Sequence, residues 1–582
     1  MSAPTLNEGT AVHVDRVAGS LRDSNTVMDP LDMGGARATR HSFMRSMIRR
    51  AVNAGWQIQL THFDVDAAGC GSAVYEVRAE SHLFSFVAFS QRLSEEERTD
   101  RVIAKAWDLT AALVEGPVDS ERLERMRAEV PRQEEGRAEA GSLIWTRANR
   151  SERFFEYVAD RLAAGLQPEA GKFGGSPYLI RSTAFYSNGK CGLADYEGFE
   201  DGHPLAIPYR AHMLTAWLLR ELSYEMVQAV AAARNPDAVQ LSGPWRRYLG
   251  MGNATGLGMV PYAINHPEVI NSWAMLREVP LAAVTSRTAE PNDPSIPRVI
   301  GLMEQAIAYL AEQGDINTAP FTPGPELAET LTGLLEQLRG WVSTGIFAGR
   351  HTTHIWHELH DAAAAQGPAA RGMVATVLTE LSEDTDETVE SLLRCDESRR
   401  VAAATSCAHL AADIDAAYCW IGAFDFSTPD SQQHFWFSSV NNEEPRRARL
   451  GADPGDKVQH PVDIARAVTE LRVDLATADP TMCVGEFLLS NPRHRATVAR
   501  VQNIGTLTYG EVRDNLLGAE FLPLNIQRFQ LAIYGMENYT PQSTDWLRVT
   551  LMAGAPRIAD LANGTADDAW MFTRRPQATD HA

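Results

Sequence analysis

The sequence predicts an α+β protein in which two diverged copies of an α+β unit, each an antiparallel meander plus helices, are separated by an inserted all-helical domain. Three observations predict this fold. A seven-residue motif occurs twice, alternating apolar and polar residues surround its first copy, and the segment between the copies shows helical periodicity. Self-similarity indicates repeated architecture, while periods of about 2 and 3.6 residues indicate strands and helices.

The first unit is predicted to span 41–205, after an N-terminal segment, 1–40, that we expect to be flexible. Its strands are indicated by alternation and by β-branched and aromatic residues, with turns where glycine and polar residues gather. The predicted elements are strands over 57–60, 73–77 and 83–89, helices over 102–113 and 153–164, and a closing strand over 178–186.

The repeated motif is Asp-Val-Asp-Ala-Ala-Gly-Cys at 64–70 and Asp-Ile-Asp-Ala-Ala-Tyr-Cys at 413–419. At nearly the same spacing, a segment that starts at Arg181 parallels one that starts at Arg528. A second unit is therefore predicted at 396–560, before a C-terminal tail at 561–582. Its predicted elements are helices over 462–475 and 483–489 and a closing strand over 527–534.

The segment between the copies, 206–395, is predicted to be a helical domain. Apolar residues recur there at helical spacing, and proline and glycine mark the starts and stops. An asymmetric insertion in a duplicated scaffold is also where we expect a functional site. The predicted helices lie over 208–234, 297–313, 326–343 and 368–393.

Composition excludes some partners. The chain of 582 residues has 75 acidic and 53 basic residues, a net charge of −22, which argues against binding to nucleic acid or to anionic lipid. No apolar run is long enough to span a membrane, no apolar leader is visible, and the six cysteines form no C-x-x-C pair. We therefore expect a cytoplasmic protein with reduced thiols.

A histidine-rich stretch at 351–361 is the first candidate site. On a helix, His354, His357 and Glu358 share one flank, and side chains at i, i+3 and i+4 can reach one divalent metal ion. The pattern is not H-E-x-x-H, which leaves a solvated polar face as the alternative. A divalent metal is the cofactor that the metal interpretation implies.

A glycine-rich stretch is the second candidate site. Gly250, Gly252 and Gly256 permit positive φ and close approach of backbone amides to a ligand, and Asn253 lies among them. The spacing matches neither a dinucleotide fingerprint nor a P-loop, so a nucleotide cofactor is not expected. The structural alternative is that these glycines make tight turns.

Residues near this stretch complete a predicted site for a small anionic molecule. Arg181 or Arg246 would anchor the charge of the substrate, and Asn253 would stabilise developing negative charge. His266, which follows Asn265 in the predicted substrate loop, would be the general acid and base.

A second predicted loop places Lys190 beside Cys191, and a neighbouring cation favours the thiolate of a nucleophilic cysteine. An inert Cys191 is the alternative. The repeated acidic motif offers two carboxylates on one strand face, which could share a proton or hold a divalent ion, but we favour a turn or cap that both copies would keep.

The leading functional hypothesis is a metabolic enzyme that acts on a small anionic molecule by hydrolase or lyase chemistry without a nucleotide cofactor. Its pocket would lie between the helical insertion and the α+β units, because domain junctions favour pockets. The alternatives are a metal-dependent enzyme that uses 351–361 and a non-catalytic ligand-binding or scaffold protein. A homo-oligomer is compatible with each.

Overall fold

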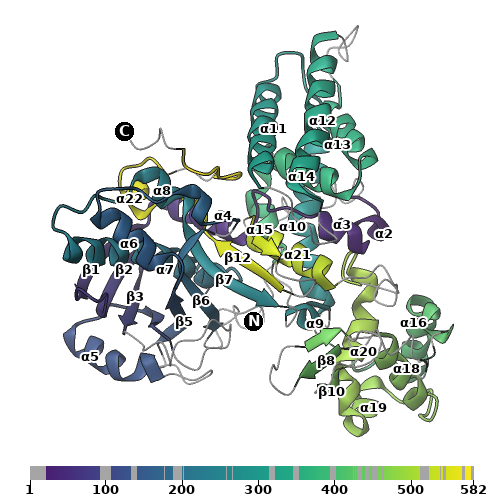
Figure 1. Ribbon diagram of the computed structural model, residues 1–582. Coiled ribbons are helices and arrows are strands. Elements are labelled where there is room, and N and C mark those ends of the chain that lie inside the picture. The colour runs from purple at the N-terminus through teal and green to yellow at the C-terminus, as the bar shows by residue number, and fades with distance from the viewer. Residues whose placement is uncertain are drawn as a thin grey trace.

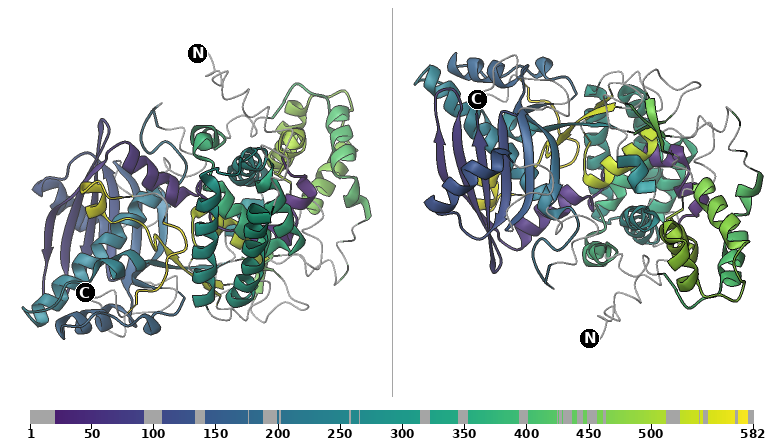
Figure 2. Two further views of the ribbon diagram at one scale, coloured as in Figure 1. Left: turned by 90° about the horizontal axis from the view of Figure 1, so that it is seen from above. Right: turned by 90° about the horizontal axis from the view of Figure 1, so that it is seen from below.

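The computed structural model describes most of the chain between residues 21 and 577. The described ranges are 21–91, 107–132, 141–175, 177–187, 199–200, 202–256, 259–264, 266–313, 322–344, 353–393, 401–423, 425, 428, 436–439, 445–447, 456–460, 464–511, 523–537, 539–541, 546–566 and 570–577. Figures 1 and 2 show three neighbouring groups: a sheet with its helices, an upright helical group, and a smaller helical group at the lower right of Figure 1.

A nine-stranded sheet dominates the first group, in the order β1-β2-β3-β4-β5-β6-β7-β12-β11. The chain is thus mixed α+β. Neighbouring strands pair antiparallel except β6 and β7, which are parallel. The strands are β1 (Gln57–Val65), β2 (Gly71–Ala79), β3 (His82–Ser90), β4 (Leu109–Glu115), β5 (Ser142–Arg150), β6 (Tyr178–Ser187), β7 (Gly250–Gly256), β11 (Tyr539–Pro541) and β12 (Trp546–Leu551).

Both faces of the central strands are buried, in two different clusters. Val74 and Ala112 pack with α5 (Ser120–Glu129) on one face, whereas their neighbours Tyr75 and Ala111 belong to the main core on the other. α7 (Arg210–Arg234) packs on the main-core face, with α6 (Phe155–Ala163) against it. Successive side chains of these strands therefore alternate between the two buried clusters, and not between a buried and an exposed face.

The predicted strands of the first meander, its closing strand and the helix at 153–164 are confirmed by β1, β2, β3, β6 and α6. The helix predicted over 102–113 is wrong in its described part, because β4 starts at Leu109. The apolar run of β4 is too short to distinguish a helix from a strand by its periodicity. The segment forms a strand because it pairs with β3 on one side and β5 on the other.

The upright group has its own hydrophobic cluster, drawn from residues between Leu281 and Leu381 together with Met571 and Phe572. Helices predicted over 208–234, 297–313 and 326–343 are confirmed, while the segment 368–393 is divided into α14, a short 3-10 helix and α15. The helices of this group are α11 (Ser295–Glu312), α12 (Gly324–Thr344), α13 (Ile355–Ala365) and α14 (Pro368–Thr379). α10 (Pro267–Thr285) contributes to both clusters, while α8 (Gly243–Tyr248), α9 (Met259–Ile264) and α15 (Asp386–Ser391) pack in the main core.

The sheet takes strands from all three predicted domains. β7 lies within 206–395, which was expected to be all helical, and pairs with β6 and with β12 from the predicted second unit. The domain boundaries remain a prediction, but the described strands do not separate at residues 205 and 395.

The internal duplication is not confirmed. The motif at 64–70 ends β1 and forms a turn, whereas residues 413–417 lie in α16 (Cys407–Ala417). The strand predicted over 527–534 is wrong, because this segment belongs to α21 (Pro523–Tyr534). Leu410 and Ile414 are both buried at an i, i+4 spacing, so the second copy of the motif packs as a helix.

In its described residues the smaller group contains α16, α18, α19 and α20, with a three-stranded sheet in the order β10-β8-β9 beside them (Figure 1). Helices predicted over 462–475 and 483–489 are confirmed by α18 and α19. The remaining elements are α18 (Ile464–Leu475), α19 (Val484–Ser490), α20 (Arg495–Asn503), β8 (Trp436–Ser439), β9 (Pro445–Arg447) and β10 (Asp456–His460).

The two ends of the described chain are packed rather than loose. Residues 21–40 form α2 (Ser24–Val27) and α3 (Pro30–Gly35), with Val27 and Met33 buried, before α4 (Phe43–Asn53) begins. This differs from the flexible segment expected there. Near the other end, α22 (Ile558–Ala562) precedes a segment in which Trp570 and Phe572 are buried.

None of the described helices is both long and apolar enough to cross a membrane.

Candidate functional site

The parallel junction of β6 and β7 brings some predicted site residues together. Arg181 lies opposite Gly252 in the register, and Asn253 Nδ2 donates a hydrogen bond to Ser182 Oγ at 2.9 Å. Both strands end at the same edge of the sheet, which is where ligands bind in parallel sheets. Arg181 thus lies beside the glycine-rich stretch, and its role in substrate binding stays a prediction.

The glycines themselves form strand β7 instead of a loop, which corrects the prediction. A Cβ on Gly252 would lie 2.5 Å from the ring of Tyr178, and one on Gly250 would contact the carbonyl oxygen of Leu551. Gly256 pairs with Trp546 of β12. Gly250 and Gly252 thus let neighbouring groups approach the strand closely, which is a packing role.

Arg246 and His266 lie in helix connections. Arg246 Nε donates to the carbonyl oxygen of Leu241 at 3.1 Å, and its Nη1 lies 3.3 Å from Glu225 Oε1. The half-buried His266 precedes α10, where its carbonyl oxygen accepts the Val269 N–H. Their roles in substrate binding and acid–base chemistry stay predictions. Lys190, Cys191 and Asn265 lie outside the described residues.

The predicted metal ligands lie at the start of α13. His354, His357 and Glu358 are all exposed, and His357 Nε2 lies 3.4 Å from Asp361 Oδ2. The described part of the chain contains no group of three or more His, Cys, Asp or Glu side chains placed to hold a metal ion. This geometry favours the solvated polar flank, and the metal centre stays a prediction.

The first acidic motif is a turn, as favoured from the sequence. Asp66 Oδ1 accepts hydrogen bonds from the N–H groups of Ala68 and Cys70, both at 2.8 Å. The side chain therefore caps the connection between β1 and β2.

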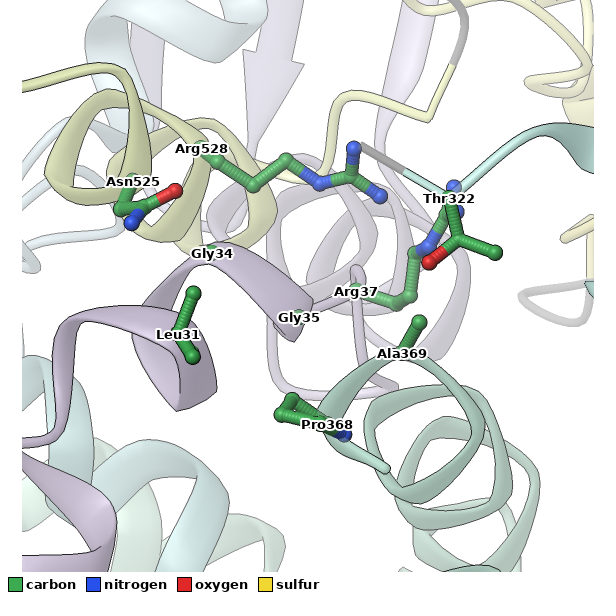
Figure 3. Close-up of a pocket in the computed structure, with 9 residues that line it drawn as sticks. All are labelled: Leu31, Gly34, Gly35, Arg37, Thr322, Pro368, Ala369, Asn525 and Arg528. Carbon is green, nitrogen blue, oxygen red and sulfur yellow. The ribbon is translucent and has the colours of Figure 1, made fainter. Parts of the chain in front are cut away.

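A cavity of about 120 Å³ lies where α3, α14 and α21 meet (Figure 3). α3 packs against both α14 and α21, so residues from distant parts of the chain form one wall. Space of this size holds several waters or one small molecule. The lining residues are Leu31, Gly34, Gly35, Arg37, Thr322, Pro368, Ala369, Asn525 and Arg528.

Two arginines give the cavity its charge. Arg528 is 3% exposed, and its Nε donates to the carbonyl oxygen of Ala36 at 3.2 Å. Burial first, and then the positive charge of Arg37, lower the pKa of Arg528 well below its usual range. Burial also lowers the pKa of Arg37. Desolvation disfavours both positive charges, and a bound anion would favour them.

Asn525 adds an unpaired amide. Its side chain is 0% exposed, and within the described part of the chain neither Oδ1 nor Nδ2 has a hydrogen-bond partner. A buried amide without partners is rare and destabilising by about 1–3 kcal/mol, so its presence beside a cavity points to a ligand.

The cavity also receives helix ends. Pro368 and Ala369 are the first two residues of α14, and Asn525 lies in the first turn of α21. Helix N-termini carry partial positive charge, which favours an anion.

The nearby acidic groups Asp32 and Glu537 do not line the cavity and have other partners. Asp32 forms an ion pair with Arg371 across α3 and α14. Glu537 attracts the charges of both cavity arginines, but it accepts the Phe572 N–H at 3.1 Å, and burial raises its pKa. Among the described residues that line the cavity, none is acidic.

Sequence reasoning missed Arg37 and Asn525, and it noted Arg528 only as part of the repeat. One signal was available. α21 carries polar residues on every side, between apolar ones, and a helix with no apolar stripe that is still buried indicates a polar interior. The structure confirms that Asn525, Gln527, Arg528 and Gln530 are all buried.

Comparison with known proteins gave no match to a family model, to a curated protein or to a solved structure.

Proposed function

We propose that this protein binds a small anionic molecule in the cavity between α3, α14 and α21. The observation that carries the proposal is the pair of desolvated arginines, Arg37 and Arg528, in a cavity whose described lining has no acidic side chain. Guanidinium groups bind carboxylates and phosphates with charge-assisted hydrogen bonds. The unpaired amide of Asn525 supports a ligand with polar groups.

Binding is supported better than catalysis. The described lining contains no His, Asp, Glu or Cys that could transfer a proton or attack a substrate. Hydrolase or lyase chemistry at Asn253 and His266 therefore remains a prediction with less support than anion binding. We place the protein in the cytoplasm because its cysteines are sparse and scattered.

The test is thermal unfolding in phosphate, sulfate or malonate, each against chloride at equal ionic strength. A ligand present at 100 times its Kd stabilises the native state by about 2.7 kcal/mol. We expect such stabilisation with at least one polyatomic anion. We also expect Arg37→Met and Arg528→Met each to weaken binding on the order of 10- to 100-fold, because each removes charged hydrogen bonds.

The matched control is Arg339→Met, which removes the same charge from an exposed ion pair with Glu304. This variant should respond to anions like the parent protein. Equal responses of all three variants would show nonspecific screening and refute the site.

A further inference from the structure

The cavity has two chemically different ends. Figure 3 shows the side chains of Arg37 and Arg528 extending toward Thr322, while Asn525 lies at the other end, over Gly34. The positive charge of Arg37 also lowers the pKa of Arg528, in agreement with this arrangement. Leu31, Pro368 and Ala369 form an apolar side of the cavity. The arginine end therefore favours an anionic group, and the apolar side favours the carbon atoms of a ligand. The Asn525 end favours a neutral polar group.

The amide of Asn525, at the end of the cavity away from the arginines, favours one kind of hydrogen-bond partner. Asn525 offers a donor and an acceptor, and both lack partners within the described residues. An anionic oxygen can only accept, so it would leave Oδ1 unpaired. A hydroxyl group donates and accepts, and can use either atom of the amide.

Gly34 holds this amide in place. A Cβ on Gly34 would lie 2.5 Å from Asn525 Oδ1 and 2.8 Å from its Cγ, so only glycine leaves the side chain where it is. The close packing of α3 against α21 thus positions a polar group that pairs with nothing in the described protein.

We propose that the ligand is a small hydroxy acid: a carboxylate or a phosphate monoester that carries a hydroxyl group a few atoms from its anionic group. The anion would lie between Arg37 and Arg528 and the hydroxyl on Asn525. This inference rests on the proposed anion binding at the same site. A volume of about 120 Å³ suits a small ligand.

The experiment is calorimetric titration with two matched pairs of probes. Lactate is compared with propionate, and 2-hydroxyethyl phosphate with ethyl phosphate, so that the two pairs separate carboxylate from phosphate recognition. The parent protein should bind the hydroxylated member of at least one pair about 10- to 100-fold more tightly, because a site built to pair with a hydroxyl discriminates against its absence.

Two variants test the role of the amide. Asn525→Leu removes the unpaired amide and keeps a similar shape, so it should fold, retain the weaker ligand and lose the preference for the hydroxyl. Gly34→Ala should lose the same preference by displacing the amide. Gln530→Leu is the matched control, because Gln530 is a buried amide of α21 that donates to Tyr534 Oη at 3.0 Å and does not line the cavity.

The outcomes separate the two proposals. Binding of none of the four probes, or of any other polyatomic anion, would refute anion binding itself. Equal affinity within both pairs would refute the hydroxy acid and leave anion binding intact. A preference that survives in Asn525→Leu would overturn the assignment of the hydroxyl to this residue.

Discussion

Arg37 illustrates at the residue scale how a binding site opposes stability. Its side chain is desolvated and lies near a second guanidinium, and within the described chain its Nε has no hydrogen-bond partner. Arg37 is only half-buried by exposure, but a desolvated charge that is incompletely paired destabilises the native state. Such a residue is explained by a ligand more readily than by folding.

The first prediction follows from this conflict. In the absence of polyatomic anions, Arg37→Met should unfold at the same temperature as the parent protein or at a higher one, because it removes a desolvated charge. Thermal unfolding in chloride measures it. A clearly lower unfolding temperature would mean that Arg37 stabilises the apo protein and would favour a structural role.

Glu278 supports a second residue-scale prediction, on pH. Its carboxylate accepts from Arg22 at 2.7 Å and from Arg277 at 2.9 Å. Burial alone raises the pKa of Glu278, but the two arginines outweigh burial and lower it to about 2. The folded state then binds fewer protons than the unfolded state. The stability that the ionised Glu278 contributes is therefore present above pH 4.5 and is lost as the pH falls from 4.5 toward 2.

Urea unfolding at pH 5 and pH 3 measures this effect. Between these two pH values the parent protein should lose roughly 2 kcal/mol more stability than Glu278→Gln. Glu304→Gln, which removes an exposed carboxylate paired with Arg339, should keep the parental slope. The same slope in Glu278→Gln as in the parent would show that Glu278 is not the group that titrates.

At the element scale, α3 and α14 meet through glycines. A Cβ on Gly372 of α14 would contact the carbonyl oxygen of Gly35, and one on Gly35 would lie 2.5 Å from the carbonyl oxygen of Pro368. Both neighbours are backbone atoms, which cannot move aside as a flexible side chain can. The wall of the cavity therefore depends on this contact.

The third prediction concerns Gly372→Ala, which should destabilise the protein by about 1–3 kcal/mol through overpacking and also weaken anion binding. Gly333→Ala in α12 is the control, because space is open there and alanine favours helix by about 0.5–1 kcal/mol. Chemical denaturation of both variants checks the prediction. A neutral Gly372→Ala would show that the two helices are less closely packed.

The fourth prediction concerns α13, whose two flanks differ. His354→Ala combined with His357→Ala should change stability by less than about 0.5 kcal/mol, because both side chains are exposed. Trp356→Ala on the buried flank should cost about 3–5 kcal/mol. Elemental analysis of untagged protein completes the test. One metal ion per chain, lost with the two histidines, would contradict the solvated flank and restore the metal hypothesis.

The same contrast explains which elements were predictable. β2 and β3 follow alternation and turn residues, and α11 and α12 have clear apolar stripes, so their types were predicted. β4 and α21 are buried on all sides. β4 is almost entirely apolar and α21 has polar residues all round, so neither sequence has one polar and one apolar face that would reveal its period. For such segments the local sequence pattern predicts the wrong secondary structure, because the strands or helices that they pair or pack with determine it.

At the scale of the whole molecule, the cavity lies between two hydrophobic clusters. α3 and α21 contribute Met33 and Phe529 to the main core, while α14 contributes Ala370 and Met373 to the helical cluster. A pocket at a junction was expected from the sequence, but none of the predicted site residues lines this one. Its arginines come from opposite ends of the chain, and only the fold brings them together.

The most direct test of anion binding is the anomalous diffraction of a crystal soaked in selenate at low chloride. The account predicts a selenium peak in the cavity, with oxygen atoms within hydrogen-bond distance of Arg37 and Arg528, and no peak there in Arg37→Met crystals. An empty cavity in parent crystals that hold selenate elsewhere would contradict the claim that this cavity binds small anions.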